Sequence, residues 1–413
     1  MHKLGFMLIK TIMLFIALVI PFGVQVGNID KFGSQFRLGN EVLVDNIDVL
    51  RDKNTAVLTN QTGILSNGTH IVDALLSKNI NVVKIFSPEH GIRGDENYSN
   101  IDEKTGIPII SLYGDKKKPS SEDLKDIDVI IYDIQDVGAR FYTYTSTLYY
   151  VIESSIENKK MLFVCDRPII INPDYVDGFM LEAAYESFVG LIPAPVCYGM
   201  TCGELANYLA VNLFQDAAYL KVYAMLNYTR STDYNSLNLP WVKPSPNMFT
   251  PQTAVCYPAA CFLEGTNVSE GRGTPKPFEY FGAPWINSEF LASRLNSYNL
   301  KGVTFETITF TPSEKISSYP PKFFNKECSG IYINVNDKNK FEAVMAGAAI
   351  LIELNKNYAE FKFNKDNFID KLAGTDNFRK AVIAGKSFDE IIEIWRTSLE
   401  VFKQKREKVL LYQ

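Results

Sequence analysis

The feature that most constrains the fold is a repeated alternation of short apolar runs and amphipathic stretches between residues 37 and 195. The runs TAVLTN, NVVKIF, DVIIYDI and MLFVCD are rich in Val, Ile and Phe, and each ends in polar or turn residues. Stretches between them, such as HIVDALLSKN and TSTLYYVIESSIENKK, have the spacing of one-sided helices. This rhythm predicts an α/β protein whose Rossmann-like domain, a parallel sheet covered by helices on both faces, spans residues 37–195.

The chain changes character beyond residue 195, which indicates a second domain. A chain of 413 residues is too long for one ordinary core. Residues 240–285 are rich in Pro, Gly, Asn and aromatic residues and show little periodicity. A loop-rich stretch of this length is usually functional or disordered, and its aromatic residues argue against disorder. Because strand-like SGIYINV and helical KFEAVMAGAAILIELNKN follow it, we expect a second domain over residues 196–413.

The composition argues against several classes of function. Hydrophobic residues make up 46% of the chain and charged residues 22%, which is typical of a soluble globular protein. The formal net charge is −5 and no basic stripe is present, so we predict no nucleic-acid partner. The loops after the apolar runs contain neither G-x-G-x-x-G nor G-x-x-x-x-G-K-[ST], so no motif indicates a nucleotide cofactor.

Six cysteines lie beyond residue 164, and we interpret them as small buried hydrophobes. Disulfides in an oxidising compartment are the alternative, because an even number of thiols permits them. The closest pairs are Cys197/Cys202 and Cys256/Cys261. Both pairs are spaced too widely for a zinc knuckle, and the chain has only three histidines that could serve as further zinc ligands. We therefore predict no metal site.

The amino terminus predicts export. His2, Lys3 and Lys10 precede or flank the apolar run TIMLFIALVIPFGVQV, which has the length of a signal-peptide core. We interpret residues 1–30 as a signal peptide or an amino-terminal anchor, because the run is near the lower length limit of a spanning helix. The expected location is the periplasm, or the inner membrane facing the periplasm, with membrane association through this segment.

The stretch FSPEHGIRG, at residues 86–94, places an acid where α/β proteins carry their chemistry. The strand-like run ends at Ser87-Pro88, so Glu89, His90 and Arg93 are expected on a loop at the carboxyl end of the strand. Glu89 is the first candidate for acid/base work, because Pro88 and apolar neighbours would partly desolvate it. A helix-capping or turn-stabilising glutamate is the alternative.

Polar residues also follow the other predicted strands of the first domain. Asn60 follows TAVLT, Asp136 and Arg140 follow DVIIYDI, and Asp166 follows MLFVC. Because the carboxyl ends of parallel strands meet at one edge, we expect these loops to converge with the Glu89 loop on one crevice. Tyr142 adds an aromatic face for a sugar ring, with core packing as the alternative.

Two further segments carry candidate residues. CDRPIIINPDYVDGFMLE contains the acids Asp177 and Glu182, and FLEGTNVSEGRGT contains Glu264, Asn267, Glu270 and Arg272. The glycines of the second segment let backbone approach a ligand, and its polar side chains offer donors and acceptors for sugar hydroxyls. A solvated hairpin is the alternative for that segment.

Together these motifs resemble one family, the NamZ-type exo-β-N-acetylmuramidases of bacterial peptidoglycan recycling. The motifs that carry the resemblance occur in the family's order: SPEHGIRG, YDIQDVGARFYTY, DRP, SFVGLIPAP, YGMTCGELA, PSPNM and CFLEGTNVSEGRGT. The resemblance spans roughly residues 40–412 and rests on several linked motifs, which makes it far more specific than any single loop. It implies a Rossmann-like domain joined to a smaller α/β domain, with residues 240–285 contributing to an active-site cleft between them.

The resemblance implies hydrolysis of the β-1,4 bond that follows a non-reducing terminal N-acetylmuramic acid in peptidoglycan-derived saccharides. Glu89 matches the family's catalytic glutamate, and Asp177 matches a second carboxyl that is usually a glutamate in a V-E-G segment. Because Asp177 is one methylene shorter, Glu182 and Glu270 are retained as substitutes. Cleavage needs two carboxyl groups and no cofactor.

The remaining candidates are predicted to bind substrate. An arginine is expected to bind the lactyl carboxylate of muramic acid, and the candidates are Arg93, Arg140 and Arg272. The full predicted sugar-binding set is Asn60, His90, Arg93, Arg140, Tyr142, Asn267, Glu270 and Arg272. An exported muropeptide-binding protein without catalysis would use the same contacts and is the alternative function. An esterase or peptidase is disfavoured, because the chain has no G-x-S-x-G and few histidines.

Overall fold

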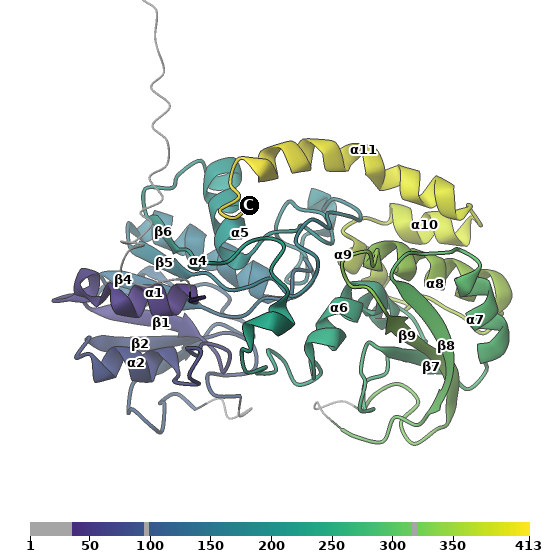
Figure 1. The fold of residues 1–413 in the computed structure, drawn as a ribbon, viewed down its shortest axis with the longest axis horizontal. Coiled ribbons are helices and arrows are strands. Elements are labelled where there is room, and N and C mark those ends of the chain that lie inside the picture. The colour runs from purple at the N-terminus through teal and green to yellow at the C-terminus, as the bar shows by residue number, and fades with distance from the viewer. Residues whose placement is uncertain (1–34, 95–98, 316–319) are drawn as a thin grey trace, which may run out of the picture. The chain divides into compact units, whose positions relative to one another are not determined.

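A parallel sheet of six strands forms the first half of the protein, in a computed structural model that describes residues 35–94, 99–315 and 320–413 (Figure 1). The strand order is β3-β2-β1-β4-β5-β6. The strands are β1 (Thr55–Thr59), β2 (Val82–Ser87), β3 (Ile109–Ser111), β4 (Val129–Asp133), β5 (Met161–Cys165) and β6 (Leu220–Tyr223). The predicted leader at residues 1–30 lies outside the described residues.

Helices cover both faces of this sheet, as predicted. Ala56 and Leu58 of β1 pack into one hydrophobic cluster, whereas Val57 between them packs into a second. Successive side chains of a strand point to opposite faces, so a strand buried along its whole length must be covered on both sides. The helices of this half are α1 (Gly39–Asp45), α2 (Ile71–Ser77), α3 (Ser121–Leu124), α4 (Tyr144–Asn158) and α5 (Cys202–Leu209).

The crevice where the strand order reverses, between β1 and β4, is filled by protein. Asp133 at the end of β4 accepts a hydrogen bond from Arg167 Nε at 2.6 Å and from Asn40 Nδ2 at 2.9 Å. Leu239 and Pro240 also border the space that remains, a cavity of about 20 Å³. Such a cavity holds roughly one water molecule, so protein fills most of the usual ligand position of a doubly wound sheet here.

The second half of the chain builds an antiparallel sheet of three strands in the order β7-β9-β8. The strands are β7 (Tyr280–Ala283), β8 (Val303–Phe310) and β9 (Cys328–Val335). The helices are α6 (Pro251–Ala260), α7 (Ser288–Asn296), α8 (Ala343–Asn357), α9 (Phe368–Ala373), α10 (Asn377–Ile383) and α11 (Phe388–Glu407). Short 3-10 or π turns are η2 (Ile47–Leu50), η3 (Ala183–Tyr185), η4 (Ala210–Phe214), η5 (Tyr234–Leu237) and η6 (Cys261–Gly265). The fold is therefore α/β with a second, smaller sheet, as predicted.

Residues 240–285 contain more regular structure than the sequence predicts, because they include α6 and β7. Thr250 caps α6 by accepting a hydrogen bond from the Thr253 amide, and Pro251 occupies the first turn, where no amide donor is needed. Pro258 lies inside the helix, and every residue from Thr253 to Ala260 is buried. A helix that is buried on all sides has no polar stripe, so its periodicity is invisible in the sequence.

The predicted limit of the first domain at residue 195 falls before β6, which pairs in parallel with β5. Contacts join residues Ser34–Gln413 into one compact unit. All six cysteines are free and buried, which confirms their interpretation as small hydrophobes. No helix within the described residues is both long and apolar enough to cross a membrane.

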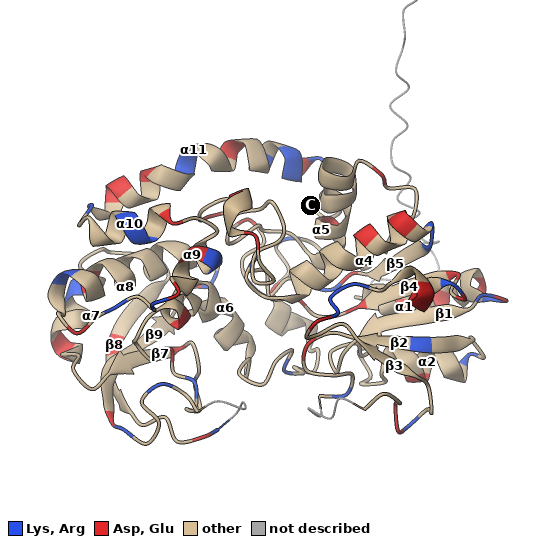
Figure 2. Ribbon diagram, turned by 180° about the vertical axis from the view of Figure 1, so that it is seen from behind, with Lys and Arg blue, Asp and Glu red and all other residues tan. Residues whose placement is uncertain are grey.

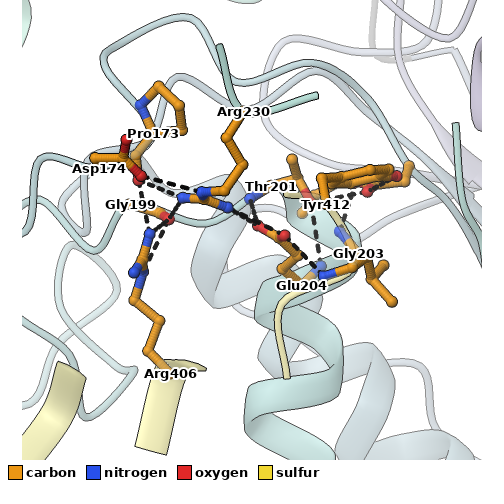
Figure 3. A network of polar contacts seen from close by, with 12 residues as sticks. Pro173, Asp174, Gly199, Thr201, Gly203, Glu204, Arg230, Arg406 and Tyr412 are labelled. Atoms are coloured by element: carbon orange, nitrogen blue, oxygen red, sulfur yellow. Dashed lines mark hydrogen bonds and ion pairs between the residues drawn. The ribbon is translucent and has the colours of Figure 1, made fainter. Parts of the chain in front are cut away.

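The carboxyl-terminal tail anchors α11 to the parallel-sheet half (Figure 3). The buried Glu204 carboxylate of α5 pairs with Arg230 at 3.0 Å and accepts a hydrogen bond from the Leu411 amide at 2.9 Å. Tyr412 donates its hydroxyl proton to Asp166 at 2.6 Å, and Arg406 donates to the Gly199 carbonyl at 3.0 Å. In Figure 1, α11 runs from α10 to a chain end beside α5. Helix α11 and the tail after it therefore join the half with the antiparallel sheet to the half with the parallel sheet.

Charged residues of both signs are mixed along α11 (Figure 2). Intrahelical pairs such as Arg396–Glu393 and Lys403–Glu400 account for part of this pattern. A nucleic-acid-binding helix would instead present one continuous basic face. The charges of α11 therefore do not form a basic face.

Candidate active site

A cavity of about 270 Å³ lies where the two halves of the chain meet. The parallel-sheet half contributes Glu89, His90, Phe141, Tyr142, Thr143, Tyr144 and Val189 to its wall. The loop before α6 contributes Ser245, Pro246, Asn247 and Met248, and later segments contribute Tyr257, Glu264, Arg272, Phe278 and Leu372. The wall combines aromatic faces with two carboxyl groups and one guanidinium group, which suits a polar ligand with apolar ring faces.

Glu89 lies on the loop that follows β2, as predicted from FSPEHGIRG. The backbone turns sharply behind it, with φ of 73° at His90 and 74° at Gly91. Thr143, the residue before α4, donates its hydroxyl proton to Glu89 Oε2 at 3.0 Å. This hydrogen bond holds the partly buried carboxyl group at the cavity wall.

A second carboxyl group, Glu264, reaches the same cavity from the other half of the chain. It lies in η6 and forms an ion pair with Arg272 Nη2. Arg272 also contacts Glu270 at 3.3 Å, and Lys322 contacts Glu270 at 3.0 Å. Burial raises the pKa of the Glu270 carboxyl, but the nearby charges of Lys322 and Arg272 outweigh burial and lower it overall. Glu270 thus orients Arg272 from behind the wall.

Aromatic rings form the inner wall of the cavity. The Tyr257 ring packs edge-on against Phe141, Tyr142 and Phe278, with ring centroids 5.2, 5.7 and 4.8 Å away. Burial raises the pKa of Tyr142 well above its ordinary value, so its hydroxyl group is neutral and can donate a hydrogen bond. The rigid aromatic wall can therefore accept the apolar face of a sugar ring and still offer polar contacts.

Two of the three arginines predicted to bind substrate have structural partners instead. Arg93 forms ion pairs with Asp102 at 2.8 Å and Asp73 at 3.1 Å. Arg140 is fully buried and donates to the carbonyl groups of Phe179, Ala194 and Leu372. Neither arginine belongs to the described wall of the cavity, whereas Arg272 does.

The acids Asp177 and Glu182 also lie away from this wall. Asp177 accepts hydrogen bonds from Trp395 Nε1 at 2.6 Å and the Tyr175 hydroxyl at 2.8 Å, and burial raises its pKa. Glu182 is exposed and accepts a hydrogen bond from the Thr375 hydroxyl at 2.7 Å. Asp177 is thus a buried link to α11, because its partners come from that helix and from its own loop.

Asn60 and Asn267 both stabilise loops. Asn60 accepts hydrogen bonds from the amide and hydroxyl groups of Thr62, at 2.9 and 2.6 Å. Asn267 exchanges hydrogen bonds with the backbone of Glu360 and Lys362.

The sequence predicts that the loops after β1, β4 and β5 all meet at the Glu89 cavity, and this prediction is wrong. Thr62, Gln135 and Arg167 instead line the small cavity beside β1.

The structure adds wall residues that are absent from the predicted catalytic and sugar-binding sets. Glu264 stands in the polar set of FLEGTNVSEGRGT but in neither predicted set, and Tyr257, Phe278 and Thr143 come from segments whose local pattern resembles ordinary core or loop. The available signal was the pairing of Glu264 with Arg272 inside one glycine-rich segment. Among the described residues, no group of three or more His, Cys, Asp or Glu side chains could hold a metal ion.

Comparisons with known proteins assign the chain to a family. Residues 55–252 match the family model "Exo-beta-N-acetylmuramidase NamZ, N-terminal", and residues 255–412 match the corresponding C-terminal model. The chain is 42% identical over 378 residues to the peptidoglycan beta-N-acetylmuramidase NamZ of Bacillus subtilis (strain 168), with 90% of each protein covered.

Two solved structures share the fold. Both are DUF1343 family proteins from Bacteroides fragilis NCTC 9343, with TM-scores of 0.84 and 0.75 at 33% and 36% sequence identity. Each comparison covers 92% of this chain and 99% of the solved one. Since both family models match in order and the relatives cover nearly the whole chain, this protein belongs to the NamZ family of exo-β-N-acetylmuramidases.

Proposed function

We propose that this protein is an exo-acting glycoside hydrolase that releases non-reducing terminal N-acetylmuramic acid from peptidoglycan fragments. The observation that carries the proposal is the single cavity that Glu89 and Glu264 share. Glycosidases use two carboxyl groups that flank the scissile bond. The name of the Bacillus subtilis relative supplies the substrate class, because that protein is a peptidoglycan beta-N-acetylmuramidase.

Glu89 is the proposed proton donor. Its carboxyl group is positioned by the Thr143 hydroxyl and faces a cavity rather than bulk solvent. In this role the protonated carboxyl group gives its proton to the glycosidic oxygen as the bond to the anomeric carbon breaks. A neutral sugar alcohol then leaves in place of an alkoxide.

Glu264 is the proposed second carboxyl group, in place of Asp177 or Glu182. The ion pair with Arg272 orients it, and it reaches the cavity from the half of the chain opposite Glu89. There it assists the anomeric carbon by acting on the attacking water or on the substrate's 2-acetamido group. Asp177 is poorly suited to this role, because both of its oxygens already accept hydrogen bonds from protein groups.

Arg272 is the proposed contact for the lactyl carboxylate that distinguishes muramic acid from glucosamine. Its guanidinium group lines the cavity and lies 5.0 Å from the Phe278 ring centroid. Contacts with Glu264 and Glu270 fix its direction, and a guanidinium group has five N–H donors, so donors remain for a third carboxylate.

An assay with matched chromogenic substrates tests the proposed function. The purified protein should hydrolyse an aryl β-N-acetylmuramide and leave the matching N-acetylglucosaminide nearly untouched. Release of muramic acid only from the non-reducing end of a longer saccharide would establish exo action. Binding of the saccharide without turnover of either substrate would instead support a non-catalytic muropeptide-binding protein.

We also propose that the protein is exported. The basic residues and the apolar run within residues 1–30 support this, and that segment lies outside the described residues. The native protein should fractionate with the periplasm, or with the inner membrane if the segment remains as an anchor. Recovery of the full-length protein only from the cytoplasm would contradict export.

A further inference from the structure

A cluster of one cation and two aromatic rings, Tyr113, Lys117 and Phe188, lies outside the described cavity wall. Lys117 Nζ is 4.1 Å from the Phe188 ring centroid and 4.8 Å from the Tyr113 ring centroid. Tyr113 is exposed, with 39% of its residue surface accessible. No described carboxylate forms an ion pair with Lys117, whereas its neighbours Lys116 and Lys118 both pair with acids.

Strand register places the loop that carries Tyr113 beside the loop that carries Glu89. β2 and β3 are parallel neighbours, with Ser87 opposite Ser111. Glu89 and Tyr113 each follow that matched pair by two residues, and neighbouring strands lie roughly 4.8 Å apart. The two loops therefore leave the same edge of the sheet side by side.

Hydrogen bonds from the start of α4 also connect the cluster to the cavity. Thr143, just before α4, donates to the Glu89 carboxyl group, and Ser146 in its first turn donates to the Phe188 carbonyl at 2.8 Å. Three residues of helix rise by ~4.5 Å, so the two anchor points lie within one turn of each other. Val189, which follows Phe188, belongs to the cavity wall itself. The cluster thus forms a rim of the cavity on the Glu89 side.

The rim is held firmly from behind. Lys118 Nζ pairs with Glu153 at 2.7 Å and Glu157 at 2.8 Å on α4. Ser154 of the same helix donates to the Pro119 carbonyl at 2.7 Å. These contacts fix the loop after β3, so Lys117 and Tyr113 are presented from a rigid support.

We propose that Tyr113, Lys117 and Phe188 form the subsite for the leaving saccharide, the N-acetylglucosamine side of the cleaved bond. This inference rests on the proposed function. The muramic acid unit occupies the aromatic cavity near Arg272, so the next sugar must extend past the proton donor Glu89, and the rim lies there. An exposed tyrosine ring can stack on the apolar face of a pyranose, and an ammonium group can donate to its hydroxyl or acetamido oxygens.

The test compares two leaving groups in Lys117→Met, which keeps an unbranched side chain one atom shorter and removes the charge. For the disaccharide of N-acetylmuramic acid and N-acetylglucosamine, kcat/KM should fall about tenfold, as expected for one lost hydrogen bond to a charged group. The aryl β-N-acetylmuramide offers no hydroxyl or acetamido group to Lys117, so its kcat/KM should stay within about twofold. Free N-acetylglucosamine should also inhibit aryl-glycoside hydrolysis more weakly in the variant.

Lys125→Met is the matched control, because Lys125 is an exposed lysine that pairs with Glu122 on the surface. Tyr113→Ala provides a second variant that should also weaken inhibition by N-acetylglucosamine. A ratio of disaccharide to aryl turnover that is unchanged in Lys117→Met would overturn the subsite while leaving the proposed function intact. Failure of the unmodified protein to cleave either substrate would remove the proposed function, and this subsite with it.

Discussion

The Thr143 hydroxyl donates a 3.0 Å hydrogen bond to the Glu89 carboxyl group, joining the residue before α4 to the loop after β2. Tyr144, the next residue, donates its hydroxyl proton to the Pro244 carbonyl at 2.5 Å and so reaches the loop before α6. The start of α4 therefore holds together the acid and the segment that closes the cavity over it. This relationship makes Glu89 a positioned group rather than a freely moving surface acid.

Glu89→Gln should lower turnover of an unactivated muramyl disaccharide by about 10²- to 10⁴-fold, because the amide cannot give a proton to the leaving oxygen. An aryl glycoside with a good leaving group should lose less, since its departure needs little protonation. Binding and thermal stability should be retained. Steady-state kinetics on both substrates check this, with Glu182→Gln as a control of the same chemistry outside the cavity wall. Near-normal disaccharide turnover by Glu89→Gln would remove Glu89 as the acid.

Glu264→Gln should lower turnover of both the disaccharide and the aryl glycoside by about 10²-fold or more, because the second carboxyl group acts at the anomeric carbon regardless of the leaving group. This equal loss distinguishes it from Glu89→Gln, whose loss depends on the leaving group. Rates should be measured on both substrates together with circular dichroism. If activity falls only in proportion to the fraction of protein that is unfolded, Glu264 has a structural role and no catalytic one.

Arg272→Ala should sharply reduce the preference for the muramide over the glucosaminide, because the charge-assisted contact with the lactyl carboxylate is lost. Arg93→Ala should leave that preference unchanged, since Arg93 is held by Asp102 and Asp73. The measurement is the ratio of kcat/KM for the two aryl glycosides in each variant. A change of preference in Arg93→Ala but not in Arg272→Ala would reverse the assignment.

The Asp102 ion pair should make a pH-dependent contribution to stability. A hydrogen bond from Arg93 lowers the pKa of Asp102 from its ordinary 3.8 to about 2. A carboxyl group with a depressed folded-state pKa stabilises the fold above its unfolded pKa, and this stability is lost as pH falls from about 4 through about 2. With allowance for screening by solvent, the contribution at neutral pH is about 1–2 kcal/mol.

Asp102→Asn should therefore lower the free energy of unfolding at pH 7 by about this amount. The difference from the unmodified protein should shrink between pH 4 and pH 2, as measured by urea unfolding across the pH range. A difference that stays constant over that range would mean that the ion pair does not cause the loss.

Asp177→Asn should reduce stability and leave activity per folded molecule nearly unchanged. The asparagine oxygen can still accept from Trp395, but its amide nitrogen would face the Tyr175 hydroxyl in place of an acceptor. Disturbing one buried hydrogen bond costs about 1–3 kcal/mol. Thermal unfolding and active-site titration check this prediction. Full stability with a large fall in turnover would instead support Asp177 as the second catalytic carboxyl group.

Local pattern was enough to predict most of the parallel sheet. β1, β4 and β5 are fully or almost fully buried runs of apolar residues, and such runs leave a signal in the sequence that depends on no distant partner. The position of Glu89 after β2 followed in the same way, because Pro88 has no N–H to continue the hydrogen bonding of the strand. The helix α6 was missed, because burial on all sides removes the polar stripe on which such a prediction depends.

By itself, the sequence determined the α/β class, the motifs of the family and the placement of Glu89 on a loop at the sheet edge. Only the tertiary structure decided which residues share a cavity with Glu89. Arg93, Arg140 and Arg272 are equally plausible anion contacts in the sequence, but the first meets carboxylates, the second meets carbonyl groups and the third faces the cavity. The physical reason is that ion pairs and cavity walls form between segments far apart in the chain, and local periodicity carries no information about those partners.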